Sequence, residues 1–529
     1  MSFPDRNNPY NFDEYLQWRE SVDYYADDPF IQKVVKHFTG PEWQIVDREA
    51  RSVSRKASFR WRKMADDIAC PEKRPYMVHY DGHKHRIDRI VRPVETQIME
   101  KEIFSEGIFS SSTSPWVKLV KMYIIYQNGE ACVACPLTCT EGMVEILKKN
   151  AGTEETRQIL RHCREGIDGD FAIGAQYLSE IQGGSDVPAN VLEAVQEEGQ
   201  WRLYGGKFFC SATHADYAMV TAKPVGSEKV ALFVVPSWLP GNKEKEIRNG
   251  YTIDRIKWKM GTSELTTAEL TFNGALAYQV GPLERGLANV VGVVLTYSRL
   301  TVGLSAAGFM TRATREAKKY VEFREAFGSK ISQFPLVAGQ LQKIDRLTKQ
   351  TVAGAFKVYH QFLQLEEELR GGLAGDDSGK RRQFDIRELI MLQKIAASWD
   401  CTDVIRLAMS LFGGHGVMED FSALPRLYRD SAVNELWEGP RNVLLMQIFR
   451  DLQRAAGWYR PGDFVANILK GSEESVIEKF QAEISQLLAC SQSRADEHSM
   501  EIYQRWDNFC QDLFHQYQLN ALNEVERSL

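Results

Sequence analysis

The chain has 529 residues and a formal net charge of −6, with 43% hydrophobic and 26% charged residues. This balance is typical of a folded globular protein, and it excludes a disordered chain, a collagen-like repeat and a small disulfide-stapled scaffold. The overall charge gives no sign of a nucleic-acid or anionic-membrane surface. The length predicts several domains.

The first twenty residues contain no basic region followed by an apolar one, so they do not resemble a signal or transit peptide. The longest uninterrupted apolar stretch, around Val290 to Leu295, is too short to span a bilayer. We therefore expect a cytoplasmic protein with reduced thiols and no membrane insertion.

The first part of the chain, residues 1–167, shows helical periodicity and few strand-like runs, and we expect an N-terminal α-helical domain. Its clearest helical segments are Ile31–Phe38, Ile87–Phe104 and Cys139–Lys149. The pattern changes between residues 168 and 281. There, short β-rich runs are separated by turn residues: WRLYGGKFF, YAMVTAKPV, KVALFVVPSW, YTIDRIKWKM and LTTAELTF. Their spacing predicts a middle domain built as an antiparallel β-sandwich or barrel.

After Pro282 the periodicity is helical again, which predicts a C-terminal four-helix bundle over residues 282–460. The expected helices are Gly286–Phe327, Phe334–Leu369, Phe384–Phe412 and Val433–Ala456, with GGLAGDDSGK as one connecting loop. Residues 461–529 form an extra C-terminal helical segment with five basic and twelve acidic side chains. Contacts of this segment with phosphates would be electrostatically opposed. The fold class is thus α+β and multi-domain, in the order α, β, α.

Two clusters could bind a metal. Cys132, Cys135 and Cys139 have a spacing that an iron–sulfur cluster could use, but a fourth ligand is needed and the flanks read as helix, which favours buried free thiols. His79, Asp81, His83 and His85 lie in a turn-like stretch without a recognised ligand spacing, so a solvated turn is the better interpretation. We predict no metal site.

Three short elements could carry chemistry. Ser179–Asp186 contains paired glycines and a serine, which can receive a phosphate through free backbone N–H groups, although an ordinary turn has the same pattern. Gly413–Gly416 follows a helical segment and alone is a helix C-cap. In Trp437-Glu438-Gly439, a glutamate between an aromatic residue and glycine can be partly desolvated, which raises its pKa and makes it a stronger base. Alternatively, Glu438 only complements a helix dipole.

Taken together, these elements resemble those of the acyl-CoA dehydrogenase family of flavoproteins, and within it the long AidB-like branch. The resemblance extends over nearly the whole chain. The segments that carry it are YLSEIQGGSDVPAN, REAFGSKISQFP, SLFGGHGVMEDFSALPRLYRD and VNELWEGPRNVLL, with PLTCT at Pro136–Thr140 and the extra C-terminal segment.

The resemblance implies that FAD binds between the middle domain and the C-terminal helices. Leu178 and Ser179 match the loop that meets the flavin ring, and Ser185 matches a serine near the pyrophosphate that also faces substrate. Phe209 matches a tryptophan against the flavin, and Ser211 a hydroxyl at flavin N5. Four further residues match positions that reach the cofactor of a neighbouring subunit: Arg324, Phe327, Gly413 and Gly414. Asn442 matches another cofactor contact. A homo-oligomer, dimer or tetramer, is implied.

The resemblance also implies α,β-dehydrogenation of an acyl-CoA thioester, with Glu438 as the base that removes the α-proton. Arg299 and Gly439 match substrate-binding positions. Some branches carry the base just before this arginine, but Ser298 stands there, so Glu438 is the candidate. A glutamate also favours acyl-CoA chemistry over the monooxygenases and nitroalkane oxidases of this fold. Electrons are expected to leave to an electron-transferring flavoprotein, although the sequence does not exclude oxygen as acceptor.

Three residues depart from the typical pattern: Phe209 has no indole N–H, Pro440 replaces a threonine, and Pro335 replaces a glutamine, as in AidB-like proteins. Two other functions are therefore kept open. One is an AidB-like flavoprotein with weak dehydrogenase activity and a protective or binding role. The acidic C-terminal segment argues against nucleic acid as its binding partner. The other is a scaffold flavoprotein. The acyl group is not indicated by the sequence.

Overall fold

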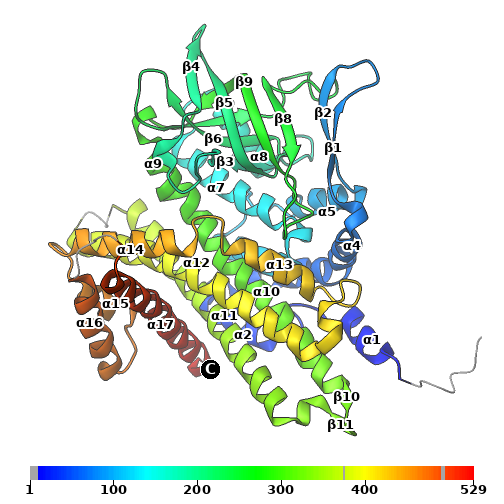
Figure 1. The fold of residues 1–529 in the computed structure, drawn as a ribbon, viewed down its shortest axis with the longest axis vertical. Coiled ribbons are helices and arrows are strands. Elements are labelled where there is room, and N and C mark those ends of the chain that lie inside the picture. Colours follow the sequence, from blue (N-terminus) through cyan, green and yellow to red (C-terminus); the bar gives the residue numbers. More distant parts are fainter. Residues whose placement is uncertain (1–9, 373–375, 490–494, 529) are drawn as a thin grey trace, which may run out of the picture.

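The computed structural model of the chain describes residues 10–372, 376–489 and 495–528. Figure 1 shows a β-barrel at one end of the long axis and a set of long helices that extend away from it. The N-terminal helices lie beside both parts. The α, β, α order predicted from the sequence is confirmed.

The N-terminal part is mainly helical and carries one β-hairpin. Its helices are α1 (Asp13–Ser21), α2 (Pro29–Thr39), α3 (Trp43–Arg55), α4 (Arg62–Ile68), α5 (Val94–Phe104), α6 (Pro115–Tyr126), α7 (Ala134–Asn150) and α8 (Glu154–Glu165). Strands β1 (Tyr76–Tyr80) and β2 (Arg86–Val91) pair antiparallel. The predicted helix Ile87–Phe104 is thus wrong in its first part. Pro93 ends the extended segment, and α5 begins directly after it.

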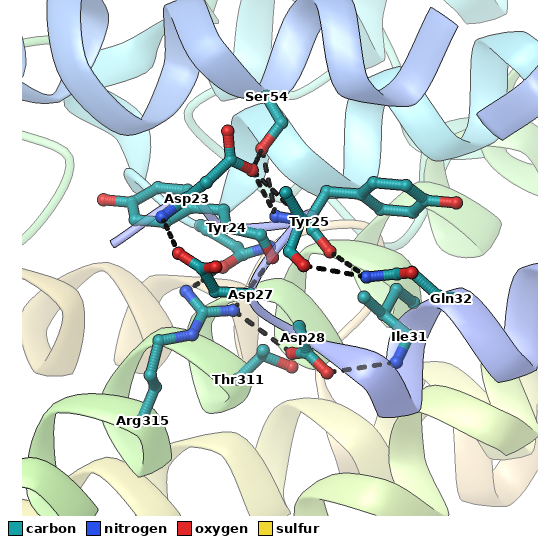
Figure 2. A network of polar contacts seen from close by, with 12 residues as sticks. Asp23, Tyr24, Tyr25, Asp27, Asp28, Ile31, Gln32, Ser54, Thr311 and Arg315 are labelled. Carbon is teal, nitrogen blue, oxygen red and sulfur yellow. Dashed lines mark hydrogen bonds and ion pairs between the residues drawn. The ribbon is translucent and has the colours of Figure 1, made fainter. Parts of the chain in front are cut away.

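The segment between α1 and α2 attaches the N-terminus to the rest of the protein through a polar network (Figure 2). The Asp23 carboxylate accepts hydrogen bonds from Ser54 Oγ at 2.5 Å and from the backbone of Tyr25 at 3.0 Å. Asp28 caps α2 and also accepts from Arg315 at 3.2 Å. Because Arg315 belongs to α10 (Leu295–Phe323), a core helix of the C-terminal part, this network fixes the N-terminal helices against that part.

The middle part is a closed barrel. Its strands are β3 (Gly174–Tyr177), β4 (Glu193–Glu197), β5 (Gln200–Ser211), β6 (Tyr217–Pro224), β7 (Ala231–Pro236), β8 (Tyr251–Ile256) and β9 (Thr267–Gln279). The barrel closes because β7 pairs with both β9 and β6. The five predicted β-runs are β5 to β9. Most pairs are antiparallel as predicted, but β3–β6 and β4–β6 are parallel.

The C-terminal part consists of long helices around an apolar core. They are α9 (Gly286–Asn289), which a π-helical turn joins to α10 (Leu295–Phe323), then α11 (Pro335–Arg370), α12 (Asp377–Phe412), α13 (Leu424–Asn434) and α14 (Arg441–Ala455). The small strands β10 (Glu325–Ala326) and β11 (Ser329–Lys330) form a hairpin after α10. In the predicted loop GGLAGDDSGK, residues 373–375 lie outside the described residues, and Asp376 caps α12.

Two of the predicted helices in this part are corrected. The expected Gly286–Phe327 ends at Phe323, because the β10–β11 hairpin follows. The expected Val433–Ala456 is two helices, α13 and α14, separated by residues 435–440. Pro440 explains the break, since proline disfavours a helical conformation in the residue before it and then serves as the N-cap of α14.

The extra C-terminal segment is helical, as predicted: α15 (Pro461–Ile468), α16 (Glu474–Leu488) and α17 (Glu497–Arg527). Helix α17 packs along α11 and α12 (Figure 1). The domain boundaries at residues 167, 281 and 460 stay predictions. One helical run, Leu283–Phe323, is apolar and long enough to cross a membrane by length and composition alone. Since 72% of its most apolar window is buried inside the protein, we interpret it as the core helix of the bundle.

Because of Asp385, we expect the stability of the contact between α12 and the C-terminal segment to depend on pH. Asp385 is buried and accepts hydrogen bonds from Tyr459 Oη at 2.8 Å and from Asn467 Nδ2 of α15 at 3.4 Å. Burial raises its pKa to about 7. The unfolded carboxyl titrates near 4. This group therefore contributes its full stability below pH 4, and the stability is lost as pH rises toward 7, at about 1.4 kcal/mol per pH unit.

We expect Asp385→Asn to flatten the stability profile between pH 4 and 7, as measured by urea unfolding at each pH. The exposed Asp403 on the same helix, changed to Asn, is the control and should leave the slope in place. An unchanged slope in Asp385→Asn would contradict the assignment.

Candidate functional site

Glu438 lies in the loop between α13 and α14, in an unusual backbone conformation. Its φ is +58°, and that of Gly439 is +101°. A side chain at Gly439 would meet Leu444 at 2.9 Å, so glycine is required there. For Glu438 the left-handed conformation costs about 1 kcal/mol or more, which persists only where neighbouring contacts enforce it.

Two buried cations enforce this loop conformation through its carbonyl groups. Lys394 Nζ, from α12, donates to the carbonyl oxygens of Glu435 at 2.8 Å and Gly439 at 2.7 Å. Arg299 Nε, from α10, donates to the carbonyl oxygen of Glu438 at 3.0 Å. The charges of both side chains therefore lie beside the Glu438 carboxylate, while their hydrogen bonds hold the main chain.

The electrostatics of Glu438 suit a base. Burial raises the pKa of its carboxyl group, and Arg299 and Lys394 oppose that rise. Burial also lowers the pKa of Lys394 to about 7. Within the described part of the chain, no hydrogen bond engages the Glu438 carboxylate. The group is thus partly desolvated and has lone pairs available for a proton. Sequence reasoning missed Lys394, although a single lysine in the apolar run IMLQKIAASW was a signal.

One cavity borders this loop directly, and a second is lined by Arg299, which binds the loop. A small one of about 10 Å³, room for roughly one water, lies against Trp437 and the thiol of Cys135. A larger one of about 240 Å³ is lined by Arg299 and by none of the loop residues 435–440. Its lining is mostly apolar with two guanidinium groups: Ala288, Val291, Gly292, Thr296, Arg299, Arg387, Ile390, Met391 and Gln447. Ser298, by contrast, is buried and faces Gln176 at 3.4 Å. Position 298 thus offers no second carboxylate.

The glycine turn that follows β3, residues 179–186, is fixed by a buried ion pair between Lys207 and Glu180. Lys207 Nζ donates to Glu180 Oε1 at 2.7 Å and to the carbonyl oxygen of Leu178 at 3.1 Å. Ser179 lies against Gly184, where a Cβ would approach Ser179 Oγ to 2.6 Å. Ser185, by contrast, is exposed. The turn therefore presents backbone and a serine hydroxyl to solvent, which fits a phosphate group.

An aromatic surface lies on the neighbouring strand β5. Phe209 is 52% exposed, and Lys257 Nζ lies 4.5 Å from its ring centroid. Ser211 Oγ is 3.1 Å from Thr267 Oγ1. An exposed flat ring beside two hydroxyl groups, close to a glycine turn, fits a planar ring system with a phosphate tail. The residues present thus fit the FAD that the resemblance implies.

The residues expected to reach a neighbouring subunit gather elsewhere. Arg324 and Phe327 lie at the β10–β11 hairpin, far from the barrel along the bundle (Figure 1). Phe327 is 99% exposed. Gly413 and Gly414 are exposed at the end of α12, where Gly413 is the C-cap with φ +60°. Tyr320 connects the two groups, since its hydroxyl lies 2.9 Å from His415 Nδ1. One chain therefore does not bring these residues to its own Glu438.

The remaining sequence candidates have plain structural environments. Asn442 is exposed, and its Oδ1 accepts from the backbone of Val443 at 3.0 Å. Cys132, Cys135 and Cys139 are buried free thiols. In the histidine cluster, His79 pairs with Asp88 and His85 with Asp81. Among the described residues, no group of His, Cys, Asp or Glu has the arrangement of a metal site. The roles of the site residues stay predictions.

Comparisons with known proteins place these features in a family. The acyl-CoA dehydrogenase middle-domain model matches residues 175–275, and the acyl-CoA dehydrogenase C-terminal-domain model matches residues 284–453. Among curated proteins, acyl-CoA dehydrogenase family member 11 of Caenorhabditis elegans is 28% identical over 452 residues, covering 80% of this chain and 70% of that protein. Putative acyl-CoA dehydrogenase AidB of Escherichia coli K12 is 24% identical over 406 residues, covering 73% and 70%.

Solved structures share the fold. ACDH-11 of Caenorhabditis elegans, determined in complex with C11-CoA, has a TM-score of 0.81 at 22% identity, covering 96% of this chain and 90% of that one. An acyl-CoA dehydrogenase of Bacillus anthracis, complexed with FAD, has a TM-score of 0.67 at 19% identity, covering 82% and 78%. With the two domain models matching more than half of its residues in order, the chain belongs to the acyl-CoA dehydrogenase family.

Proposed function

We propose that this protein is an FAD-dependent acyl-CoA dehydrogenase that oxidises the α,β-bond of an acyl-CoA thioester, with Glu438 as the base. The observation that carries the proposal is the half-buried Glu438 carboxylate, held in a left-handed loop with its pKa raised by burial. Family membership and the FAD-complexed relative support the cofactor.

In this proposal Glu438 removes the α-proton of the bound thioester. Before the reaction, Arg299 and Lys394 favour the ionised carboxylate that can accept a proton. After proton transfer, the carboxylic acid is neutral, and the same burial that raises its pKa stabilises it. Bound FAD supplies an acceptor for the hydride from the β-carbon. The apolar wall and the guanidinium groups of the 240 Å³ cavity suit an acyl thioester that enters beside Arg299.

We further propose a homo-oligomer in which Arg324, Phe327, Gly413 and Gly414 of one subunit complete the cofactor site of its neighbour. Two observations support it: the β10–β11 hairpin and the end of α12 lie away from the junction of α13 and α14 that carries Glu438, and Phe327 is exposed. Sedimentation of the FAD-loaded protein as a monomer would contradict it. The cytoplasm as location and an electron-transferring flavoprotein as acceptor belong to the same proposal.

The test is anaerobic mixing of the FAD-loaded protein with a panel of straight-chain, branched-chain, aromatic and dicarboxylic acyl-CoA thioesters. We expect one class to bleach the oxidised-flavin absorbance rapidly, which would also name the substrate class. A yellow protein that no thioester reduces would contradict the dehydrogenase and favour the AidB-like binding role. A protein unable to take up FAD would contradict the cofactor assignment.

A further inference from the structure

The C-terminal segment, which lies beyond the residues matched by the family models, contacts Arg441, the residue that directly follows the loop of Glu438. Arg441, the first residue of α14, follows Glu438 by three positions. Its guanidinium group is held by α17: Nε donates to Asp507 Oδ1 at 2.7 Å, and Nη2 donates to Gln511 Oε1 at 2.8 Å. The last long helix of the chain thus fixes the exit of the candidate base loop.

The same guanidinium group also contacts α12. Arg441 Nη1 donates to the carbonyl oxygen of Ile395 at 3.2 Å, and the Trp399 ring lies 5.0 Å from its central carbon. Ile395 follows Lys394, which holds the carbonyl oxygens at both ends of the loop. The loop is therefore clamped at one side by Lys394 and at the other by Arg441.

Asp400 determines how Gln511 is oriented. Gln511 Nε2 donates to Asp400 Oδ1 at 2.9 Å, so its amide oxygen faces Arg441. His515 Nε2 lies 2.8 Å from the other carboxylate oxygen of Asp400. Below these groups, Trp506 is buried and its Nε1 donates to the carbonyl oxygen of Leu445 at 3.0 Å. Helix α17 is thus attached to both α12 and α14 around Arg441.

If α17 only packed against the bundle, one ion pair with Arg441 would be enough. Instead, side chains of α17 and a carbonyl group of α12 all bind Arg441, the residue that follows the loop. A left-handed glutamate needs surroundings that over-determine its conformation. We propose that Asp507 and Gln511 are positioning residues, which act through Arg441 to hold the Glu438 loop in its reactive conformation. This inference rests on the proposed function of Glu438 and gives the extra C-terminal segment a role in that reaction.

The test compares Asp507→Ala/Gln511→Ala with Tyr517→Phe in the full-length, FAD-loaded protein. Tyr517 is on the same helix, but its hydroxyl bonds Gln361 of α11 at 2.7 Å, so the control loosens α17 away from Arg441. The first readout is hydrogen–deuterium exchange of the peptide covering residues 435–441, which needs no substrate. The second is the rate of anaerobic flavin reduction by the thioester that the wild-type protein accepts, measured from pH 5 to 9.

We expect faster exchange of this peptide in the double variant only, and flavin reduction slowed about 10- to 100-fold, as for a misplaced reacting group. The pH at which the rate is half-maximal should also move, because a displaced Glu438 changes its distance from Arg299 and Lys394. Tyr517→Phe should change none of these. If the double variant does not fold, Asp507→Asn is measured in the same way and is expected to show smaller changes of the same sign.

The inference is overturned if a folded Asp507 variant has the same hydrogen–deuterium exchange, flavin-reduction rate and pH profile as the wild-type protein. Equal changes in Tyr517→Phe would overturn it as well, because they would indicate general loosening of α17. A wild-type protein that no thioester reduces would instead count against the proposed function, and the exchange data would still decide whether α17 holds the loop.

Discussion

Replacing Glu438 with glutamine is expected to slow flavin reduction by an acyl-CoA by about 10²- to 10⁴-fold, the usual contribution of a general base. The change keeps the volume of the side chain and removes only its ability to accept the α-proton. The backbone contacts of Arg299 and Lys394 with the loop do not involve the Glu438 side chain, so the fold is expected to persist. FAD content should stay at the wild-type level.

The measurement is anaerobic stopped-flow absorbance of the oxidised flavin, with FAD content determined for each preparation. Glu435→Gln is the matched control, because the same isosteric change is made in the same loop while the carbonyl group that binds Lys394 is retained. It is expected to react at close to the wild-type rate. Normal flavin reduction in Glu438→Gln would remove Glu438 as the base.

The layout of the fold was predictable because each part has its own periodicity. The runs WRLYGGKFF to LTTAELTF alternate over short distances between turn residues, and they became β5 to β9. The parallel pairs of the barrel were not predictable in the same way. They depend on β3 and β4, which are short, and on the register with β6, which is a long-range property.

The local conformation at Glu438 was hidden by a helical pattern. Apolar residues continue at helical spacing through Val433–Ala456, so periodicity alone predicts one helix. Gly439 and Pro440 carried the contrary signal, and they dominate because proline restricts the residue before it more strongly than periodicity favours a helix. What holds the loop was beyond the sequence, because Arg299, Lys394 and Arg441 meet it from three helices.

The exposed ring of Phe327 illustrates a different limit. A sequence motif can match residues that serve a shared site, but only a structure shows that the β10–β11 hairpin, beside Arg324 and Phe327, lies far from the junction of α13 and α14, which carries Glu438 (Figure 1). The distance follows from the length of α10, a 29-residue helix with Ser298 and Arg299 near its first turn and the hairpin after its last. Linear motifs do not contain this separation.

Replacing Lys207 with methionine is expected to lower the free energy of unfolding by about 3 to 5 kcal/mol, the cost of leaving a buried charge without its partner. The Lys207 and Glu180 side chains are 0% and 1% exposed. Glu180 Oε2 also accepts from the backbone of Val191 at 2.7 Å, so the carboxylate cannot turn toward water without breaking the turn. Destabilisation should therefore reach the glycine turn, and FAD retention should fall with it.

A double change separates the lost charge partner from the lost packing. Lys207→Met/Glu180→Gln removes both charges while keeping an amide that can accept from Val191, so it should recover part of the stability lost in Lys207→Met alone. Calorimetric melting temperature and the ratio of FAD to protein after gel filtration report the two effects. If the double variant is no more stable than Lys207→Met, the unpaired carboxylate is not the cause. If FAD retention is unaffected in a destabilised Lys207→Met, the ion pair supports the barrel alone and not the turn that presents Ser185.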